Sequence, residues 1–302
     1  MIESIWTGLR FPAGGFQNVM AAPVAPDGKM RTIGPFVAVA HAQPTSLAPG
    51  ALPLNDDVRP HPHIGIATLS YLFNGTMIHR DTLGAIQVIE PGAVNWMVAG
   101  RGVVHSERYE ALRRDGGMMH GLQIWVALPE PHEEDEPSFH HFAAAEIPGF
   151  EGEGVRGRLL AGAADGLVSP VSVRSPLYLQ DVHLDEGVAF AVPKAHEERA
   201  LYVISGALEC GGRSVEAGQT IMFAPRSDAG VKALRASHVL GFGGGPIGKR
   251  YLWWNFVNSA QDRIEAAKAS WREGRFGLPT DDARDFTPLP ADHERPLLTL
   301  NA

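Results

Sequence analysis

Short apolar runs separated by turns that contain glycine or proline set the strongest limit on the fold of this chain. Before residue 130 the clearest runs are "FVAVAHA" (36–42), "IATLSYLF" (66–73), "AVNWMVA" (93–99) and "GLQIWVAL" (121–128). The second run is followed by Asn74-Gly75, the strongest two-residue signal for a hairpin. Runs of this kind, spaced by roughly ten residues, are typical of antiparallel β-sandwiches and barrels. The sequence therefore predicts an all-β protein.

The same pattern returns in the second half of the chain. Its clearest runs are "PLYLQDVHL" (176–184), "RALYVISG" (199–206) and "QTIMFAP" (219–225). The segment "SYLFNGTMI" in the first half is matched by "LYVISGALE" in the second, and "IEPGAVNWM" is matched by "VEAGQTIMF". A repeat of domain length predicts two duplicated β-barrels.

A proline-rich acidic segment, "LPEPHEEDEPSF" (128–139), separates the two halves. It lacks apolar periodicity, and a charged segment of this kind is typical of a solvated connector. We therefore expect an exposed acidic linker over residues 131–140, between an N-terminal domain at 1–130 and a C-terminal domain at 141–302.

Residues 258–277 differ from the rest because they are rich in helix-forming residues. Ser259 and Asp262 have the spacing of a capping box, and Trp271 falls on the apolar side of the predicted helix. We expect a helix here that Trp271 anchors to a barrel, followed by an extended tail.

Composition and charge exclude several classes of protein. The net charge of −8 disfavours a surface that coats nucleic acid, because phosphate binding needs clustered Lys and Arg. The one cysteine, Cys210, cannot form an internal disulfide, which fits a reducing cytoplasm. The N-terminus lacks the pattern of a secretory signal, and no apolar run reaches the ~18 residues of a membrane span. We expect a cytoplasmic protein without direct contacts to nucleic acid or membrane.

Two pairs of potential metal ligands stand out. His61 and His63 flank Pro62 at the start of a predicted strand, and His105 and Glu107 have the same i, i+2 spacing. Side chains at i and i+2 of a strand point to the same face. If the two strands are neighbours and both faces turn inward, three imidazoles and one carboxylate converge. For either pair alone, exposed histidines at the end of a strand are the alternative.

Such a set of side chains suits a divalent transition metal. Imidazole binds Fe, Zn, Cu and Ni, and an added carboxylate moves the preference towards Fe(II) or Mn(II) in an open octahedral site. Four protein ligands would leave up to two positions for water, substrate or oxygen. The ligand set alone does not choose between Fe and Mn, and Ni, Zn and Cu stay open as well.

The segment "RPHPHIGIATLSYLFNGTMIHRDTLGAIQVIEPGAVNWMVAGRGVVHSER" (59–108) resembles the signature of the pirin family, a branch of the cupin superfamily. The resemblance continues through "GLQIWVALP" to "FGGGPIGKRYLWWNFV" and "WREGRFG". It implies a bicupin, in which two antiparallel β-barrels, each a double-stranded β-helix, pack face to face. It also implies a metal, usually iron, in the N-terminal barrel only. Carried over by motif, the ligands are His61, His63, His105 and Glu107.

The chain departs from the family pattern beside the first histidine pair. Many pirins read "HPHRGFET" where this chain reads "HPHIGIAT", so that Ile64 and Ala67 replace an arginine and a glutamate. Neither position is a ligand in the family, so we expect the metal site to persist. The entrance of the pocket is expected to be more apolar.

The resemblance also implies a function. Pirins are associated with flavonol (quercetin) 2,4-dioxygenase activity, which implies a small aromatic substrate and dioxygen as partners. The metal would polarise a chelating flavonol as a Lewis acid, and Glu107 is the expected catalytic base for the 3-hydroxyl proton. The alternative is an iron-dependent, redox-sensitive regulatory protein that binds a transcriptional or metabolic partner.

Several other histidines need an assignment. We expect His79 to line the pocket or orient a ligand, and His120 and Gln123 to face the barrel interior; a structural role is the alternative for each. The adjacent His140 and His141 are expected on the surface, because consecutive strand residues diverge.

The second half offers weaker metal ligands than the first. His196 and Glu198 stand where a metal-binding pair would begin, but no second pair follows them in the next strands. A salt-bridged surface feature is the better interpretation, and we expect no metal site from this pair.

Overall fold

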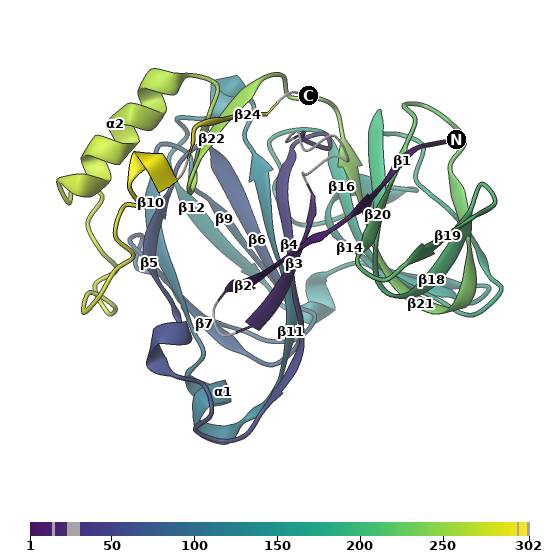
Figure 1. The fold of residues 1–302 in the computed structure, drawn as a ribbon, viewed down its shortest axis with the longest axis horizontal. Coiled ribbons are helices and arrows are strands. Elements are labelled where there is room, and N and C mark those ends of the chain that lie inside the picture. Colours follow the sequence, from purple (N-terminus) through teal and green to yellow (C-terminus); the bar gives the residue numbers. More distant parts are fainter. Residues whose placement is uncertain (14–15, 23–30, 295, 301–302) are drawn as a thin grey trace.

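The computed structural model describes residues 1–13, 16–22, 31–294 and 296–300. Strands dominate it, and they form two β-units that lie side by side, with the longer of two helices on the outer face of the first unit (Figure 1). The predicted all-β fold with two cupin domains is confirmed, although the sheets of each unit are open rather than closed barrels.

The first unit contains two antiparallel sheets. The larger has, in spatial order, β12 (Ser138–Phe142), β9 (Val94–Val98), β6 (Ile66–Asn74), β11 (Gly117–Ala127), β4 (Phe36–Leu47), β3 (Phe16–Ala22) and β2 (Leu9–Ala13). The smaller has β5 (Val58–His63), β10 (Val103–Arg108), β7 (Met77–Asp81) and β8 (Ile86–Ile89). A short helix, α1 (Glu110–Asp115), follows β10. The chain passes from β5 to β6 to β7 and so alternates between the sheets.

The Asn74-Gly75 pair does not form the predicted hairpin. β6 before it belongs to the larger sheet and β7 after it to the smaller, so the turn is a corner between sheets. Gly75 has a φ of 83°, and a Cβ there would lie 2.7 Å from the carbonyl oxygen of Met118. Glycine is therefore required by the backbone conformation and by the close approach of a neighbouring strand.

The second unit is one extended antiparallel sheet. Its main path is β1 (Ile2–Thr7), β20 (Gln219–Phe223), β18 (Glu198–Cys210), β21 (Gly230–Gly244), β16 (Leu177–Leu184), β14 (Val155–Ala164) and β13 (Gly149–Gly152). Three short strands lie beside this path: β15 (Leu167–Val168), β17 (Ala189–Ala191) and β19 (Arg213–Glu216). The sheet wraps around an apolar core that includes Tyr178, Leu201 and Val239.

Each end of the chain crosses to the other unit. β1 pairs with β20 of the second unit. Near the C-terminus a small sheet of β23 (Phe256–Asn258), β22 (Arg250–Trp253) and β24 (Leu298–Leu300) packs on the first unit, where Leu252 and Val257 join a cluster with Ile66. The division into 1–130 and 141–302 stays a prediction, and these crossings add contacts that it does not include.

The C-terminal helix, α2 (Gln261–Arg272), is shorter than the predicted range 258–277. The predicted capping box is wrong, since the Ser259 hydroxyl donates to Glu133 instead of capping the helix. The anchoring role of Trp271 is confirmed, because its ring is buried in a cluster with Ile64 of the first unit.

The acidic segment is less solvated than predicted. The side chain of Glu133 is buried, with Oε1 2.9 Å from Nε of Arg250 and with Ser259 donating to Oε2. Its last residues form β12, which pairs with β9. The charge pattern indicated solvent, but a buried arginine from the distant β22 supplies a countercharge that the local sequence does not reveal.

The two units pack face to face through their largest apolar cluster. Alternate residues of β6, among them Leu69 and Tyr71, meet Leu179 of β16 and Leu240 of β21. The intervening residues of β6 point into the first unit, as the two-residue period of a strand requires. Over the described ranges, no helix combines the length and the apolar character that crossing a membrane needs.

Candidate metal centre

Strand pairing in the smaller sheet brings the two predicted ligand pairs together. β5 and β10 are antiparallel neighbours, with His105 directly opposite His61 and Val103 opposite His63. Each pair occupies one face of its strand. The expected convergence of His61, His63 and His105 therefore follows from the register, and the alternative of exposed strand-end histidines is wrong, since all three are buried.

The three imidazoles face one another. One ring nitrogen of each lies within 4.8 Å of the corresponding atoms of the other two. Nδ1 of His61 donates to the carbonyl oxygen of Arg59 at 2.9 Å, and Nδ1 of His63 donates to that of Asn255 at 3.1 Å. Because Nδ1 carries the proton in both rings, Nε2 is left with its lone pair free for a metal.

Glu107 lies beside His105 rather than among the three imidazole nitrogens. Its Oε1 is 3.3 Å from Nδ1 of His105, and it is not part of the set of ligand atoms that lie within 4.8 Å of one another. The pairing of β10 with β5 shifts register between His105 and Glu107, so the simple i, i+2 geometry is disturbed at this point. The ligand role of Glu107 stays a proposal.

The electrostatics of this cluster favour a cation. Burial, and then the neighbouring imidazoles, hold the pKa values of His63 and His105 well below the usual value, and burial lowers the pKa of His61 to about 4. Burial raises the pKa of Glu107 to about 8, against the opposing effect of Arg108. The histidines are therefore neutral at pH 7, the form that binds metals.

Two atoms of the cluster make no hydrogen bond to any described residue: Nε2 of His105 and Oε2 of Glu107, both buried. An unpaired buried polar atom costs free energy, and a bound metal would satisfy both. The donor set, with neutral imidazole nitrogens and a carboxylate, therefore fits a divalent transition metal.

His79 lies next to this cluster, as expected. Its Nδ1 is 3.4 Å from Nδ1 of His105, and its Nε2 is hydrogen-bonded to Asp81 at 2.8 Å. The ring stacks on Phe139 with centroids 4.3 Å apart. These contacts fix the ring in place beside His105, although its role in orienting a ligand stays a proposal.

His120 and Gln123 lie on opposite faces of β11. Ser70 donates to Gln123 inside the first unit at 2.7 Å. His120 points instead to the interface between the units, where its Nε2 is 2.8 Å from Nε2 of His41. The expected interior position of His120 is wrong, because residues three apart on a strand point in opposite directions.

The adjacent histidines of β12 also separate. His140 is exposed, as predicted. His141 is half-buried and its Nδ1 is 2.7 Å from Oδ1 of Asn95, so the expected surface position is wrong for this residue. The acidic segment gives no local signal of a strand, yet β12 forms at its end and pairs with β9. This pairing turns His141 towards the core.

His196 and Glu198 of the second unit serve the fold. Nε2 of His196 donates to the carbonyl oxygen of Ala163, and Glu198 accepts a hydrogen bond from the backbone N–H of Gly34. Among the described residues neither belongs to a group that could hold a metal.

A different group in the second unit could hold a metal, and the sequence reasoning missed it: Asp181, His183 and His238. Asp181 and His183 have the same i, i+2 spacing as the first histidine pair, in "LQDVHL", so a local signal existed. His238 lies 55 positions further along in "ASHVL", and only the strand register joins it to them.

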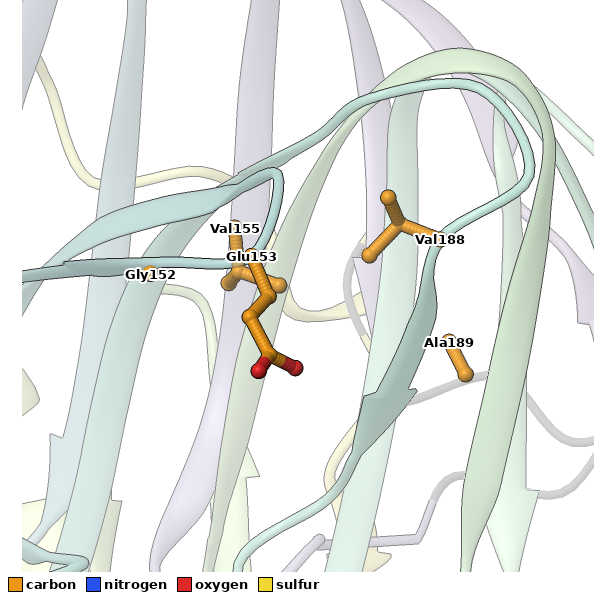
Figure 2. A pocket seen from close by; sticks show the side chains of 5 residues that line it. All are labelled: Gly152, Glu153, Val155, Val188 and Ala189. Carbon is orange, nitrogen blue, oxygen red and sulfur yellow. The ribbon is translucent and has the colours of Figure 1, made fainter.

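A hollow on the second unit is separate from both histidine groups. It lies between the turn of β13 and β14 and strand β17, and is lined by Gly152, Glu153, Val155, Val188 and Ala189 (Figure 2). Glu153 is the one charged residue of this lining, and apolar side chains supply most of the rest. The hollow offers no set of groups for catalysis.

Comparison with known proteins places this geometry in context. The family model named Pirin matches residues 17–126, and that of the Pirin C-terminal cupin domain matches residues 179–277. A "Pirin-like protein" of Caulobacter vibrioides is 46% identical over 96% of this chain and 100% of its own length. Pirin-1 of Arabidopsis thaliana is 31% identical over 72% of this chain and 77% of its own. A crystal structure of quercetin 2,3-dioxygenase from Acinetobacter baumannii is similar with a TM-score of 0.84 and 30% identity, over 96% of both chains.

Proposed function

The chain belongs to the pirin family, and from that premise we propose that it is a metal-dependent dioxygenase of flavonol-type aromatic substrates such as quercetin. The observation that carries the proposal is the buried group of His61, His63 and His105, with two ring nitrogens freed by Nδ1 hydrogen bonds to backbone carbonyls. The similarity to a structure of quercetin 2,3-dioxygenase supports the substrate class.

We assign the metal to His61, His63, His105 and Glu107, with Fe(II) as the expected ion and Mn, Ni, Zn and Cu as alternatives. When bound, the metal supplies Lewis-acid polarisation of a chelating substrate and a meeting point with dioxygen. The three histidines contribute neutral nitrogen donors, because burial keeps their pKa values low. His79 holds the His105 ring in position through its contact at 3.4 Å.

Glu107 is the proposed general base. Its Oε2 is buried and makes no hydrogen bond to a described residue. We propose that the carboxylate loosens from the metal to accept the 3-hydroxyl proton of a flavonol. A base in this position contributes roughly 10²–10⁴-fold to the rate of a proton transfer. The expected apolar entrance at Ile64 and Ala67 is wrong, because Ile64 is buried in the cluster with Trp271 and Ala67 is buried in the apolar cluster that joins the units.

The test is turnover of a flavonol by the full chain, loaded in turn with Fe(II), Mn(II) and Ni(II). Loss of the flavonol absorption band with matching oxygen uptake is expected, together with its abolition in His61→Ala. Glu107→Gln keeps the side-chain shape, and we expect it to lower turnover at saturating metal by at least about 100-fold. His140→Asn, an exposed histidine on β12, is the matched control and should keep full activity. Tight metal binding without turnover of any flavonol would refute the dioxygenase proposal.

One feature supports the regulatory alternative. Leu83, Ile86 and Val88 are exposed apolar residues at or next to β8, which is the edge strand of the smaller sheet. An exposed apolar edge strand can pair with another protein chain. In that function a change in the redox state of the metal would alter binding of a partner protein. The test above would then show no turnover of a flavonol.

A further inference from the structure

The second histidine group lies between the two units and not inside the second one. Asp181 and His183 stand on β16 at alternate positions that continue from Leu177 and Leu179, both members of the apolar cluster that joins the units. Because a strand has a period of two, all four share the face turned towards the first unit. The group is therefore not the counterpart of the first centre, which is in the interior of its unit.

Strand register assembles this group. β16 and β21 are antiparallel neighbours, and His183 is directly opposite His238. Their rings are stacked with centroids 4.0 Å apart. Nε2 of His238 donates to Oδ1 of Asp181 at 2.5 Å. One ligand atom of each of the three residues lies within 4.8 Å of those of the other two.

We propose that Asp181, His183 and His238 form a second binding site for a divalent transition metal of the zinc type, distinct from the centre in the first unit. Two imidazoles and one carboxylate are a common set of zinc ligands, with water in the fourth position. Ligand atoms around a tetrahedral zinc ion are roughly 3.3 Å apart. Binding at Nε2 of His238 would release to solvent the proton that this nitrogen now donates to Asp181, and widening that contact by less than 1 Å would admit the ion.

Asp181 supplies the site with one buried carboxylate. Arg156 and Arg158 of β14 stand opposite His183 and Asp181, and they contact Asp185 and the backbone carbonyl of Ala144. The ion pairs and hydrogen bonds that Asp181 makes within the described part of the chain go to His238 and Tyr71, and not to a lysine or arginine.

The first unit supplies the surroundings that orient these ligands. The Tyr71 hydroxyl of β6 donates to Oδ2 of Asp181 at 2.8 Å, which leaves Oδ1 directed at the histidines. Phe73 contacts the His238 ring edge to face, with centroids 4.7 Å apart. Such outer contacts fix the orientation of metal ligands. Asp181 and His238 are buried, while the half-buried His183 gives the ion access from solvent.

Counting bound metal tests the proposal. The full chain, stripped with a chelator, is titrated with Co(II), which replaces zinc and has visible absorption in such sites. We expect two ions per chain, one in His63→Ala, one in His183→Asn, and none in the double variant. The exposed His140→Asn control should bind two. Circular dichroism spectra establish that each variant is folded, and the half-buried position of His183 makes its replacement mild.

Two outcomes would overturn the proposal. One is a single Co(II) per wild-type chain that His183→Asn leaves in place. The other is a second ion whose affinity is the same in His183→Asn and His140→Asn, since it would then lie elsewhere. Loss of an ion in His183→Asn but not in His63→Ala would support the second site and contradict the first, so the two proposals fail separately.

A second measurement covers a variant that folds poorly. In the His63→Ala background, added Zn(II) should raise the melting temperature in proportion to the logarithm of its concentration, because it binds the folded chain through residues of β16 and β21 that the unfolded chain does not hold together. The rise should vanish in His63→Ala/His183→Asn. An identical rise in both backgrounds would overturn the proposal.

Discussion

The interiors of the two units differ in what fills them. The first encloses three buried histidines and a glutamate, whereas the second encloses an apolar core that includes Tyr178, Leu201 and Val239. Their sequences repeat the same strand pattern, so the architecture does not require a metal. The difference indicates that burial of apolar surface stabilises the interior of the second unit. In the first unit, buried polar groups cost stability but form the candidate metal centre.

The second unit also buries Gln180 and Arg199, but the acidic and histidine residues considered above lie at its boundary. His196 bonds to a backbone carbonyl, Glu198 accepts a backbone N–H, and Asp181 with its two histidines faces the first unit. The same residue types thus appear in both units, and the face of the strand on which they stand decides whether they meet inside a unit or at the interface. Three predictions test this comparison.

The largest effect is expected from the apolar core of the second unit. Leu201 is fully buried in that core, and Leu201→Ala should lower the free energy of unfolding by about 2–5 kcal/mol. Metal bound by the first unit should stay at one ion per chain. Urea unfolding with metal analysis measures both, and Leu234→Ala, at an exposed position, is the control that should change stability by about 0.5 kcal/mol or less. Loss of the first ion in Leu201→Ala would show that the units are not independent.

A substitution at the metal centre of the first unit is expected to change stability less but to lower the affinity for metal strongly. His105→Ala removes a buried nitrogen donor, and the affinity of this centre should fall by roughly 100-fold or more with the fold intact. His196→Ala in the second unit is the matched control and should leave that affinity unchanged. Competition against a chromogenic chelator gives the affinities. Global unfolding of His105→Ala, with and without metal, would make the residue structural and contradict the comparison.

The smallest effect concerns the interface and depends on pH. Burial, and then the charges of His120 and His238, lower the pKa of His41 to about 3, whereas an unfolded chain binds this proton near pH 6.5. The folded state therefore disfavours protonation of His41. The contribution of this neutral histidine to the free energy of unfolding is fully present above pH 6.5 and is lost as the pH falls towards 3. Between pH 7 and pH 5 the loss from this one group is about 2 kcal/mol.

His41→Gln isolates this contribution from those of the other buried histidines. Glutamine can retain the hydrogen bond to Tyr202 but does not titrate. The free energy of unfolding of the variant should therefore fall less steeply than that of the wild type as the pH is lowered. Chemical unfolding at a series of pH values measures the difference in slope. Parallel curves for wild type and variant would rule out His41 as a source of the acid sensitivity.

The sequence predicted what depends on local pattern. The two-residue period made His61 and His63 a same-face pair, and the alternation of apolar runs with turns gave the strands and the repeat. The helical spacing around Trp271 indicated its contact with a β-unit. These signals are local because a strand or helix fixes which side chains share a face, whatever the rest of the chain does.

What the sequence could not predict depends on pairing between distant strands. Asn74-Gly75 has the composition of a hairpin, but the fold uses it as a corner between sheets. The burial of Glu133 depends on Arg250, and the position of Asp181 depends on His238 and Tyr71. Register at these distances is set by packing of the whole molecule, so no local pattern reveals it.

The most direct test of the first centre is anomalous X-ray diffraction from crystals of the full chain as purified, recorded at the absorption edge of the metal found by elemental analysis. We predict a strong anomalous peak surrounded by His61, His63 and His105, with each imidazole nitrogen roughly 2.0–2.2 Å from the ion. The absence of an anomalous peak among these three rings, in a protein that carries stoichiometric metal, would contradict the assignment.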